Sequence, residues 1–359
     1  MLETIREYAG ERLEEAGAYE DFVERHAHWL LTIARDLHPR PEGARLEAYD
    51  RLEHEQANIR VALVRAENAN HEFLVEIPGF LWRFWLARAS VAEAQRWLEA
   101  GLSVQGGDPT SARERLLAGA LWMAYERGDY DTALARAEER LQLARHLEDM
   151  AAVARSLTML ASMLSEVGDF GRAIPLHEEA VATSERHTEA ASVLSGALHN
   201  LGAAWERAGD GRRAREAFER ALAIDRAAGD VDAIAVIHHS WAAAALLEGD
   251  YEDARSHIRE ALQLWLDHRV AAQFLDNAFV ILSELAYVDG YVKRAARLLA
   301  TVERFEEETG RVLPPHHRRR FEKVRALVES ELSAAELSAS MTQTEKGTLR
   351  QAVEYALAT

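Results

Sequence analysis

The chain contains no cysteine, which excludes disulfide bonds and thiol chemistry and fits a reducing compartment. No run of 18 apolar residues occurs, and the first residues, MLETIRE, carry charges where a signal peptide has an apolar core. We therefore expect a soluble, cytoplasmic protein with no membrane partner.

The chain also has little positive charge, and its formal net charge of −18 opposes attraction to a phosphate backbone. We expect no direct nucleic-acid partner. One basic run, HHRRR at residues 316–320, stands apart, with Lys323 and Arg325 after it. We interpret it as a solvated helix face partly balanced by the acidic run 306–308, with an anion-binding patch as the alternative.

Signatures of catalysis and metal binding are missing as well. No serine is flanked by the glycines of a nucleophile elbow, no HExxH motif occurs, and no GxxxxGK[ST] loop is present to hold phosphates. Two histidine pairs, 26/28 and 238/239, lack the three- or four-residue spacing by which helical residues share a metal ion. We expect no enzyme, no cofactor and no metal site.

Helix-forming residues, by contrast, are abundant, and residues 197–225 read as two helices joined by a tight turn. Gly209 can adopt the left-handed conformation that ends the first helix, and Asp210 can cap the second. Gly202 has no side chain, so the second helix can pack closely against the first. The spacing of Leu201, Gly202, Trp205, Ala214 and the apolar residues after them resembles a tetratricopeptide hairpin.

The hairpin recurs about every 40 residues. Its turn glycines are Gly128, Gly168, Gly209, Gly249 and Gly290, and a degenerate copy lies at residues 89–91. A small residue follows each turn glycine at the fifth position: Ala133, Ala173, Ala214, Ala254 and Ala295. The repeat predicts an all-α fold, a right-handed α-α superhelix of the tetratricopeptide-like solenoid type with about six helix pairs. We expect the first helices of the pairs to line an inner, concave wall.

The register predicts which side chains this inner wall presents. Its positions lie thirteen, ten, six, three and two residues before each turn glycine. The polar and aromatic residues found there include Arg115, Trp122, Tyr125, Arg155, Thr158, Ser162, His199, Glu206, Arg207, His239, Asn277, Glu284 and Tyr287. Such side chains suit directional contacts to a peptide or a small polar ligand. For each residue taken alone, packing between neighbouring repeats is the more economical interpretation.

Two other groups have structural interpretations. Trp82, Trp85 and Trp97 are expected to close the first repeat against the preceding long helix rather than bind a ligand. Glu303 and Glu307, with Arg311, read as a surface charge ladder.

The N-terminal part reads as helices over residues 2–16, 20–37 and 44–68, with a break at Pro39 and Pro41. Three of its segments, LETIREYAGERLEEAG, RHAHWLLTIA and LEHEQANIRVAL, together resemble large bacterial STAND-type ATPase regulators just after their nucleotide-binding and winged-helix regions. The stretch 81–102 is similar to the first repeat of their sensor arm. Residues 291–315 and 349–357 resemble the end of that arm, before a LuxR-type helix-turn-helix when one is present.

This resemblance implies three parts: residues 1–70 as a helical linker, 71–310 as the solenoid, and 311–359 as capping helices. It also implies a sensor arm that binds a protein, peptide or small effector on its concave face and contacts the ATPase core of the same regulator. The chain departs from the family because residues 345–348, EKGT, lack the first glycine of a phosphate-binding loop and no helix-turn-helix follows Leu357. The alternative is a stand-alone tetratricopeptide scaffold that joins two proteins.

Overall fold

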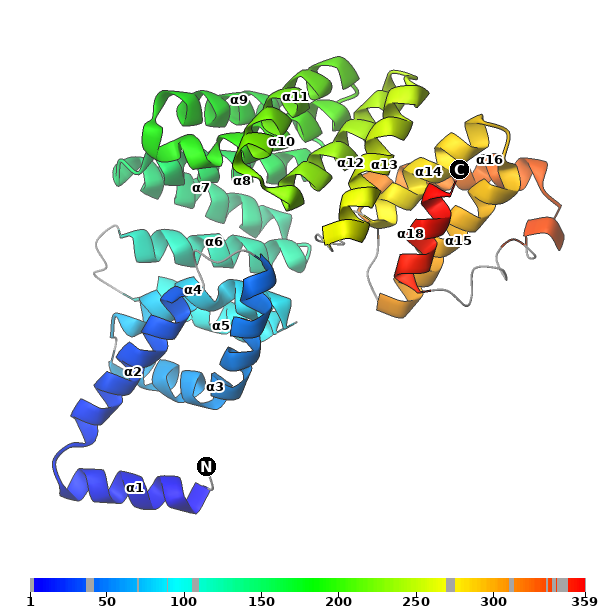
Figure 1. Cartoon of the computed structure of the whole chain (residues 1–359). Coiled ribbons are helices and arrows are strands. Elements are labelled where there is room, and N and C mark those ends of the chain that lie inside the picture. The colour runs from blue at the N-terminus through cyan, green and yellow to red at the C-terminus, as the bar shows by residue number, and fades with distance from the viewer. Residues whose placement is uncertain are drawn as a thin grey trace. The chain divides into compact units, whose positions relative to one another are not determined.

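The structure, a computed structural model, describes residues 3–36, 42–69, 71–88, 90–104, 110–268, 275–309, 313–333, 335–337, 340 and 348–358. Every regular element in these ranges is a helix, and none is a strand (Figure 1). The chain divides into two compact units, residues 1–167 and 168–359, which we describe separately. The three-part division expected from the sequence stays a prediction.

Unit 1 consists of α1 (Glu3–Glu15), α2 (Tyr19–Asp36), α3 (Glu42–Ala69), α4 (Phe73–Ala87), α5 (Val91–Leu102), α6 (Ser111–Glu126), α7 (Tyr130–His146) and α8 (Met150–Glu166). From α4 to α8, each helix packs on the next one in the sequence. The bounds of α1, α2 and α3 agree with the three helices predicted for the N-terminal part. The predicted break at Pro39 and Pro41 lies outside the described residues.

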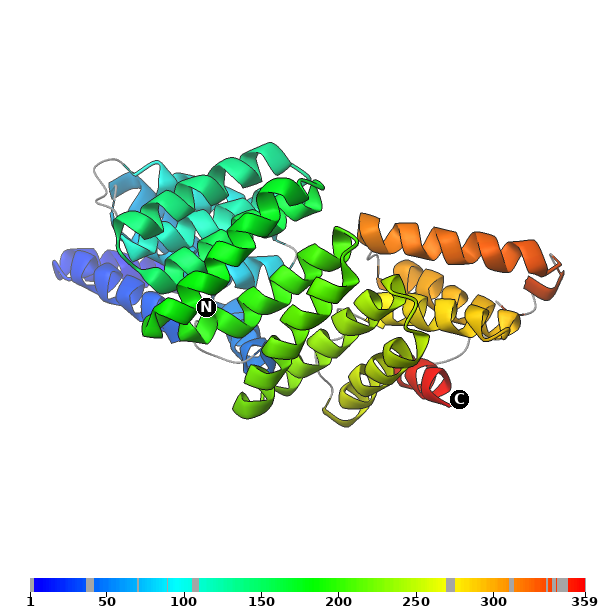
Figure 2. The ribbon, with the colours of Figure 1, turned by 90° about the horizontal axis from the view of Figure 1, so that it is seen from above.

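Unit 2 consists of α9 (Phe170–Arg186), a 3₁₀ helix (Thr188–Val193), α10 (Leu194–Arg207), α11 (Gly211–Ala228), α12 (Val231–Leu247), α13 (Tyr251–His268), α14 (Leu275–Val288), α15 (Val292–Thr309), α16 (Pro315–Glu331) and α18 (Leu349–Leu357). The pairs α10/α11, α12/α13 and α14/α15 each pack as hairpins. Both α14 and α15 also contact α16, and Figure 2 shows α16 (orange) beside them.

The predicted turns are confirmed in detail. All five turn glycines have positive φ, between 72° and 88°. Asp129, Asp169 and Asp210 each accept a hydrogen bond from the backbone N–H three residues later, which caps the next helix. These turn residues thus determine where one helix ends and the next begins.

Close packing explains the small residues. The five alanines at the fifth position after each turn glycine are fully buried. A Cβ atom added at Gly202 would lie only 2.5 Å from the ring of Phe218 in the next helix. Any side chain at Gly202 would therefore push α10 and α11 apart.

The described helices include none that is long and apolar enough to cross a membrane.

Candidate functional site

The first helices of unit 2 form one continuous surface, because α10 packs on α12 and α12 packs on α14. We call this surface the unit 2 wall. Six predicted inner-wall residues lie on it, namely His199, Glu206, His239, Asn277, Glu284 and Tyr287.

Three of these residues bond to a neighbouring first helix. Nε2 of His199 lies 3.0 Å from Oγ of Ser240, which joins α10 to α12. Nδ2 of Asn277 donates to Nε2 of His239 at 2.9 Å, which joins α14 to α12. Burial lowers the pKa of His199 to about 4 and that of His239 to about 3. Both rings are therefore neutral at pH 7 and contribute to packing between repeats.

The other residues of the wall contact α16. The Arg320 guanidinium lies 3.2 Å from Oε1 of Glu206 on α10 and 3.7 Å from Oε2 of Glu284 on α14. It also donates to the carbonyl oxygen of Ala243 on α12, at 3.4 Å. The three ion-paired side chains are only 14–16% exposed. One arginine thus bridges three successive first helices.

Further contacts extend along α16. The ring of His317 meets that of His239 edge-on, with their centroids 6.3 Å apart. Lys323 lies 3.2 Å from Glu284, and the Tyr287 hydroxyl donates to the Glu331 carboxylate at 2.7 Å. The unit 2 wall is therefore in contact with a helix of its own chain.

This finding corrects the interpretation of the HHRRR run as a solvated helix face. Arg318 does pair with Glu306, as the charge balance indicates. His316, His317 and Arg320, however, are at most half-exposed, and burial lowers the pKa of both histidines, that of His316 to about 4. The run faces a wall whose carboxylates lie far away in the sequence. An interpretation based on nearby charges therefore cannot predict this contact.

Buried apolar side chains anchor α16. Phe321, Val324 and Val328 are at most 1% exposed and belong to the same apolar core as α14 and α15. At about 1.5–3 kcal/mol for each large apolar side chain, exposing all three costs about 5–9 kcal/mol. Partner binding is thus expected to leave α16 in place.

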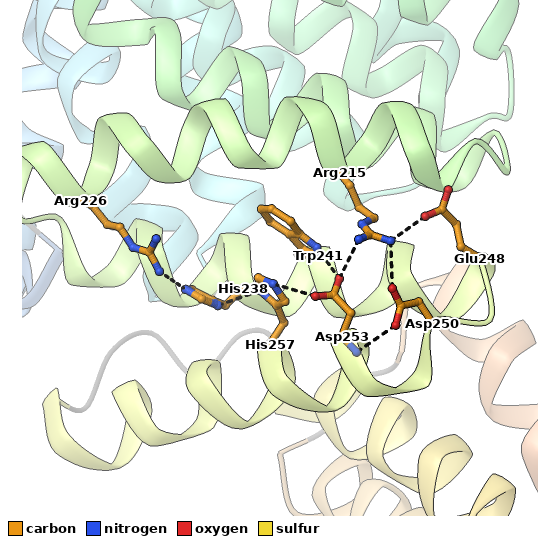
Figure 3. Close-up of polar contacts among 8 residues, drawn as sticks. All are labelled: Arg215, Arg226, His238, Trp241, Glu248, Asp250, Asp253 and His257. Atoms are coloured by element: carbon orange, nitrogen blue, oxygen red, sulfur yellow. Dashed lines mark hydrogen bonds and ion pairs between the residues drawn. The ribbon is translucent and has the colours of Figure 1, made fainter.

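A second polar network, not anticipated from the sequence, joins α11, α12 and α13 (Figure 3). Arg226 Nη2 lies 3.5 Å from Nε2 of His238, whose Nδ1 lies 2.9 Å from Nδ1 of His257, and Nε2 of His257 lies 3.5 Å from Asp253. Arg226 can only donate, so Nε2 of His238 accepts and Nδ1 of His238 carries the proton. The Asp253 carboxylate can only accept, so Nε2 of His257 carries the proton and Nδ1 of His257 accepts from His238. Burial lowers the pKa of both histidines. The network therefore holds two neutral histidines.

The same network ends in a cluster of carboxylates (Figure 3). The Trp241 indole donates to Asp253 at 2.9 Å, and Arg215 lies within 3.4 Å of Glu248, Asp250 and Asp253. His238 thus bonds to α13 and His239 to α14, so the two adjacent rings face different helices. Within the described ranges, no group of three or more histidine and acidic side chains is arranged to hold a metal ion.

The first helices of unit 1 present a different surface. There α4 packs on α6, and we call their shared surface the unit 1 wall. Trp122 stacks on Trp82 with ring centroids 6.4 Å apart and meets Tyr125 edge-on at 5.6 Å. Both Trp122 and Tyr125 are partly buried. The two predicted aromatic residues therefore lie together on a partly exposed face.

Arg115 lies on the same wall. Its guanidinium is 4.1 Å from the ring of Phe80, and its buried Nε has no hydrogen-bond partner among the described residues. Burial lowers the pKa of Arg115, an effect that Glu114 and Glu76 oppose. A half-buried cation held by an aromatic ring retains the capacity to donate hydrogen bonds to a partner.

The predicted residues on α8 do not join this cluster. Arg155 is exposed and makes no hydrogen bond or ion pair with the described residues. Thr158 donates to the carbonyl of Ala154, and Ser162 to that of Thr158, both within the same helix. Arg207, on α10 of unit 2, lies 6.0 Å from the ring of Phe170.

The structural interpretation of the three tryptophans is confirmed, whereas the charge ladder of Glu303, Glu307 and Arg311 stays a prediction. Trp82, Trp85 and Trp97 are at most 5% exposed, in one apolar core with Leu52 and Leu63 of α3. Glu303 pairs with Arg325 at 2.8 Å. Arg311, like the EKG of residues 345–347, lies outside the described residues.

Comparison with known proteins agrees with the helix-pair architecture. Residues 153–190 and 194–228 match the tetratricopeptide repeat family. The apo form of RapI is similar in structure, with a TM-score of 0.50 and 13% sequence identity over 86% of this chain and 99% of that one. The fold is all-α and built from tetratricopeptide-like helix pairs, the solenoid type expected from the sequence.

Sequence relatives are found among bacterial regulators. Proteins of Mycobacterium tuberculosis and Mycobacterium bovis, named as HTH-type transcriptional regulators, are each 29% identical over 167 residues. The match covers 44% of this chain and 19% of each relative. The chain thus corresponds to a small part of these longer proteins.

Proposed function

We propose that the chain is a protein-interaction module that binds a protein or peptide through the unit 1 wall. The observation that carries this proposal is the open cluster of Trp122, Tyr125 and Arg115 on α6. Tryptophan, tyrosine and arginine are the residue types that dominate binding energy at protein interfaces. The unit 2 wall is less suited to a partner, because Arg320 of α16 already forms ion pairs with its carboxylates.

We further propose that this module is the sensor arm of a STAND-type transcriptional regulator. Its similarity to regulators of much greater length supports this context, as does the resemblance of its N-terminal helices to the segment after the ATPase region. In this mechanism the ATPase core contacts the unit 1 wall, and an effector that binds the same wall changes how the arm contacts the core. The polar unit 2 wall, held by α16, keeps the repeats of unit 2 in a fixed arrangement.

The test begins with the reading frame upstream of Met1. If that frame encodes a phosphate-binding loop, the purified ATPase segment should bind the full chain in biolayer interferometry. We expect Tyr125→Ala and Arg115→Ala to weaken binding about 10-fold or more, since hot-spot truncations cost upwards of about 1–2 kcal/mol. Arg319→Ala, an exposed arginine on α16, is the matched control and should leave affinity unchanged.

Two results would separate the alternatives. An upstream frame without a phosphate-binding loop favours the stand-alone scaffold, whose partners are then sought by affinity capture with the same variants. Equal binding by the wild-type chain and both unit 1 variants would refute the unit 1 wall as the site.

A further inference from the structure

Unit 1 contains a cavity that is not lined by Arg115, Trp122 or Tyr125 of the unit 1 wall. It lies between α2, α3 and the start of α4 and has a volume of about 430 Å³. A space of this size accommodates a small organic molecule.

The floor of the cavity is apolar. Ala27 from α2, together with Ala62 and Ala66 from α3, is buried there. Phe73, 5% exposed, also lines the cavity, and its ring stacks on that of His71 with centroids 4.4 Å apart. Alanine methyl groups leave room for a ring or a branched aliphatic group to lie against the helices.

The rim of the cavity is polar, and its positive charge is already engaged. The Arg65 guanidinium donates to the Tyr19 hydroxyl and lies 4.9 Å from the centroid of the same ring. Glu20 and Glu24 lie one helical turn apart on α2, so their carboxylates point to the same side of the cavity. Neither forms an ion pair with a lysine or arginine of the described residues, and Glu24 has only His28, at 3.9 Å.

We propose that this cavity binds a small organic amine, with an apolar body on the alanine floor and an ammonium group at Glu20 and Glu24. The two carboxylates provide the countercharge and outnumber the single guanidinium of Arg65, which the Tyr19 side chain holds by a hydrogen bond. This site is separate from the proposed partner surface and goes beyond it. A ligand there would bridge α2 and α3.

The probe is phenethylamine, titrated into the full chain by calorimetry, with its neutral isostere 2-phenylethanol beside it. We expect phenethylamine to bind about fivefold tighter than 2-phenylethanol, because an exposed ion pair contributes up to about 1 kcal/mol. Binding of neither compound, or equal affinity for both, would overturn the proposal.

Variants then locate the site. Ala69→Leu places a larger side chain into the cavity from an exposed position and should abolish binding of both compounds, as should Ala66→Leu. The double variant Glu20→Gln/Glu24→Gln should remove the preference for the amine while retaining 2-phenylethanol. Ala87→Leu and Glu14→Gln are matched exposed controls outside the cavity and should change nothing.

Melting curves recorded without ligand show whether each variant is folded. Phenethylamine binding that survives both Ala69→Leu and Ala66→Leu, or an amine preference that survives Glu20→Gln/Glu24→Gln, would contradict the assignment. These results do not depend on Tyr125 or Arg115, so the amine site and the unit 1 wall can fail separately.

Discussion

The unit 1 wall and the unit 2 wall are built from the same kind of first helix, yet α16 of the same chain lies against the second. On the unit 2 wall, Glu206 and Glu284 meet Arg320 of α16. On the unit 1 wall, Trp122 and Arg115 meet aromatic neighbours and remain partly exposed. Repeat geometry therefore supplies a surface, and a helix outside the repeats decides whether that surface stays open.

The units also differ in their histidines. In unit 2, burial lowers the pKa of seven histidines: His177, His199, His238, His239, His257, His316 and His317. The pKa falls to about 4 for four of them, His177, His199, His238 and His316. In unit 1, burial lowers the pKa of His26. Folding of unit 2 thus depends far more on neutral imidazoles.

Lowering the pH should produce the largest difference in stability between the two units. Each lowered pKa lies below the ordinary 6.5, so the stabilisation is complete above about pH 6.5 and is lost as the pH falls towards about 4. For the buried rings of His238 and His239, this loss is about 2 kcal/mol each at pH 5. Hydrogen exchange at pH 7 and pH 5, corrected for intrinsic rates, should show that the amides of α12 lose more protection than those of α6 when the pH is lowered. Equal loss of protection in the two helices would contradict the predicted difference.

Removing the apolar anchor of α16 should have the next largest effect. Phe321→Ala deletes a side chain that is 1% exposed and should lower the free energy of unfolding of unit 2 by about 3–5 kcal/mol. The amides of α16 should then exchange faster, while those of α6 stay protected. Leu327→Ala, at a position on the same helix that is 36% exposed, is the control and should cost much less.

A smaller loss is expected from the ionic bridge. Arg320→Ala leaves the Glu206 carboxylate without its guanidinium and should cost about 1–3 kcal/mol in urea denaturation. Its exposed neighbour offers a direct control, since Arg319→Ala should stay within about 0.5 kcal/mol of the wild type. Equal costs for the two substitutions would mean that the bridge contributes nothing.

The smallest effect on stability should come from unit 1. Arg155→Ala removes an exposed side chain without a bonded partner in the described ranges, so the free energy of unfolding should change by no more than about 0.5 kcal/mol. If Arg155 contributes to recognition, the same substitution lowers partner affinity without lowering the melting temperature. A loss of stability would instead assign Arg155 a structural role.

The spacing of glycine and alanine was enough to predict the helix pairs. Gly209, Asp210 and Gly202 act within one hairpin, where sequence separation is short and each residue type has one conformational reason to be there. The same register placed His239 and Asn277 on adjacent first helices, and the structure shows them bonded to each other rather than open to a ligand.

The role of α16 could not be predicted in this way. Arg320 and Glu206 are separated by 114 positions, and no repeat relates them. A run of basic residues reads as a solvated face unless the carboxylates opposite it are known. The contact between His238 and His257 was missed for the same reason, because it depends on how α12 and α13 pack.

The most direct test of the two-wall account is hydroxyl-radical footprinting of the full chain, alone and with a bound partner. The account predicts that Trp122 and Tyr125 lose reactivity when the partner binds, while Phe321 stays unreactive in both states. Unchanged reactivity at Trp122 and Tyr125, together with a gain at Phe321, would show that the partner displaces α16 and occupies the unit 2 wall instead.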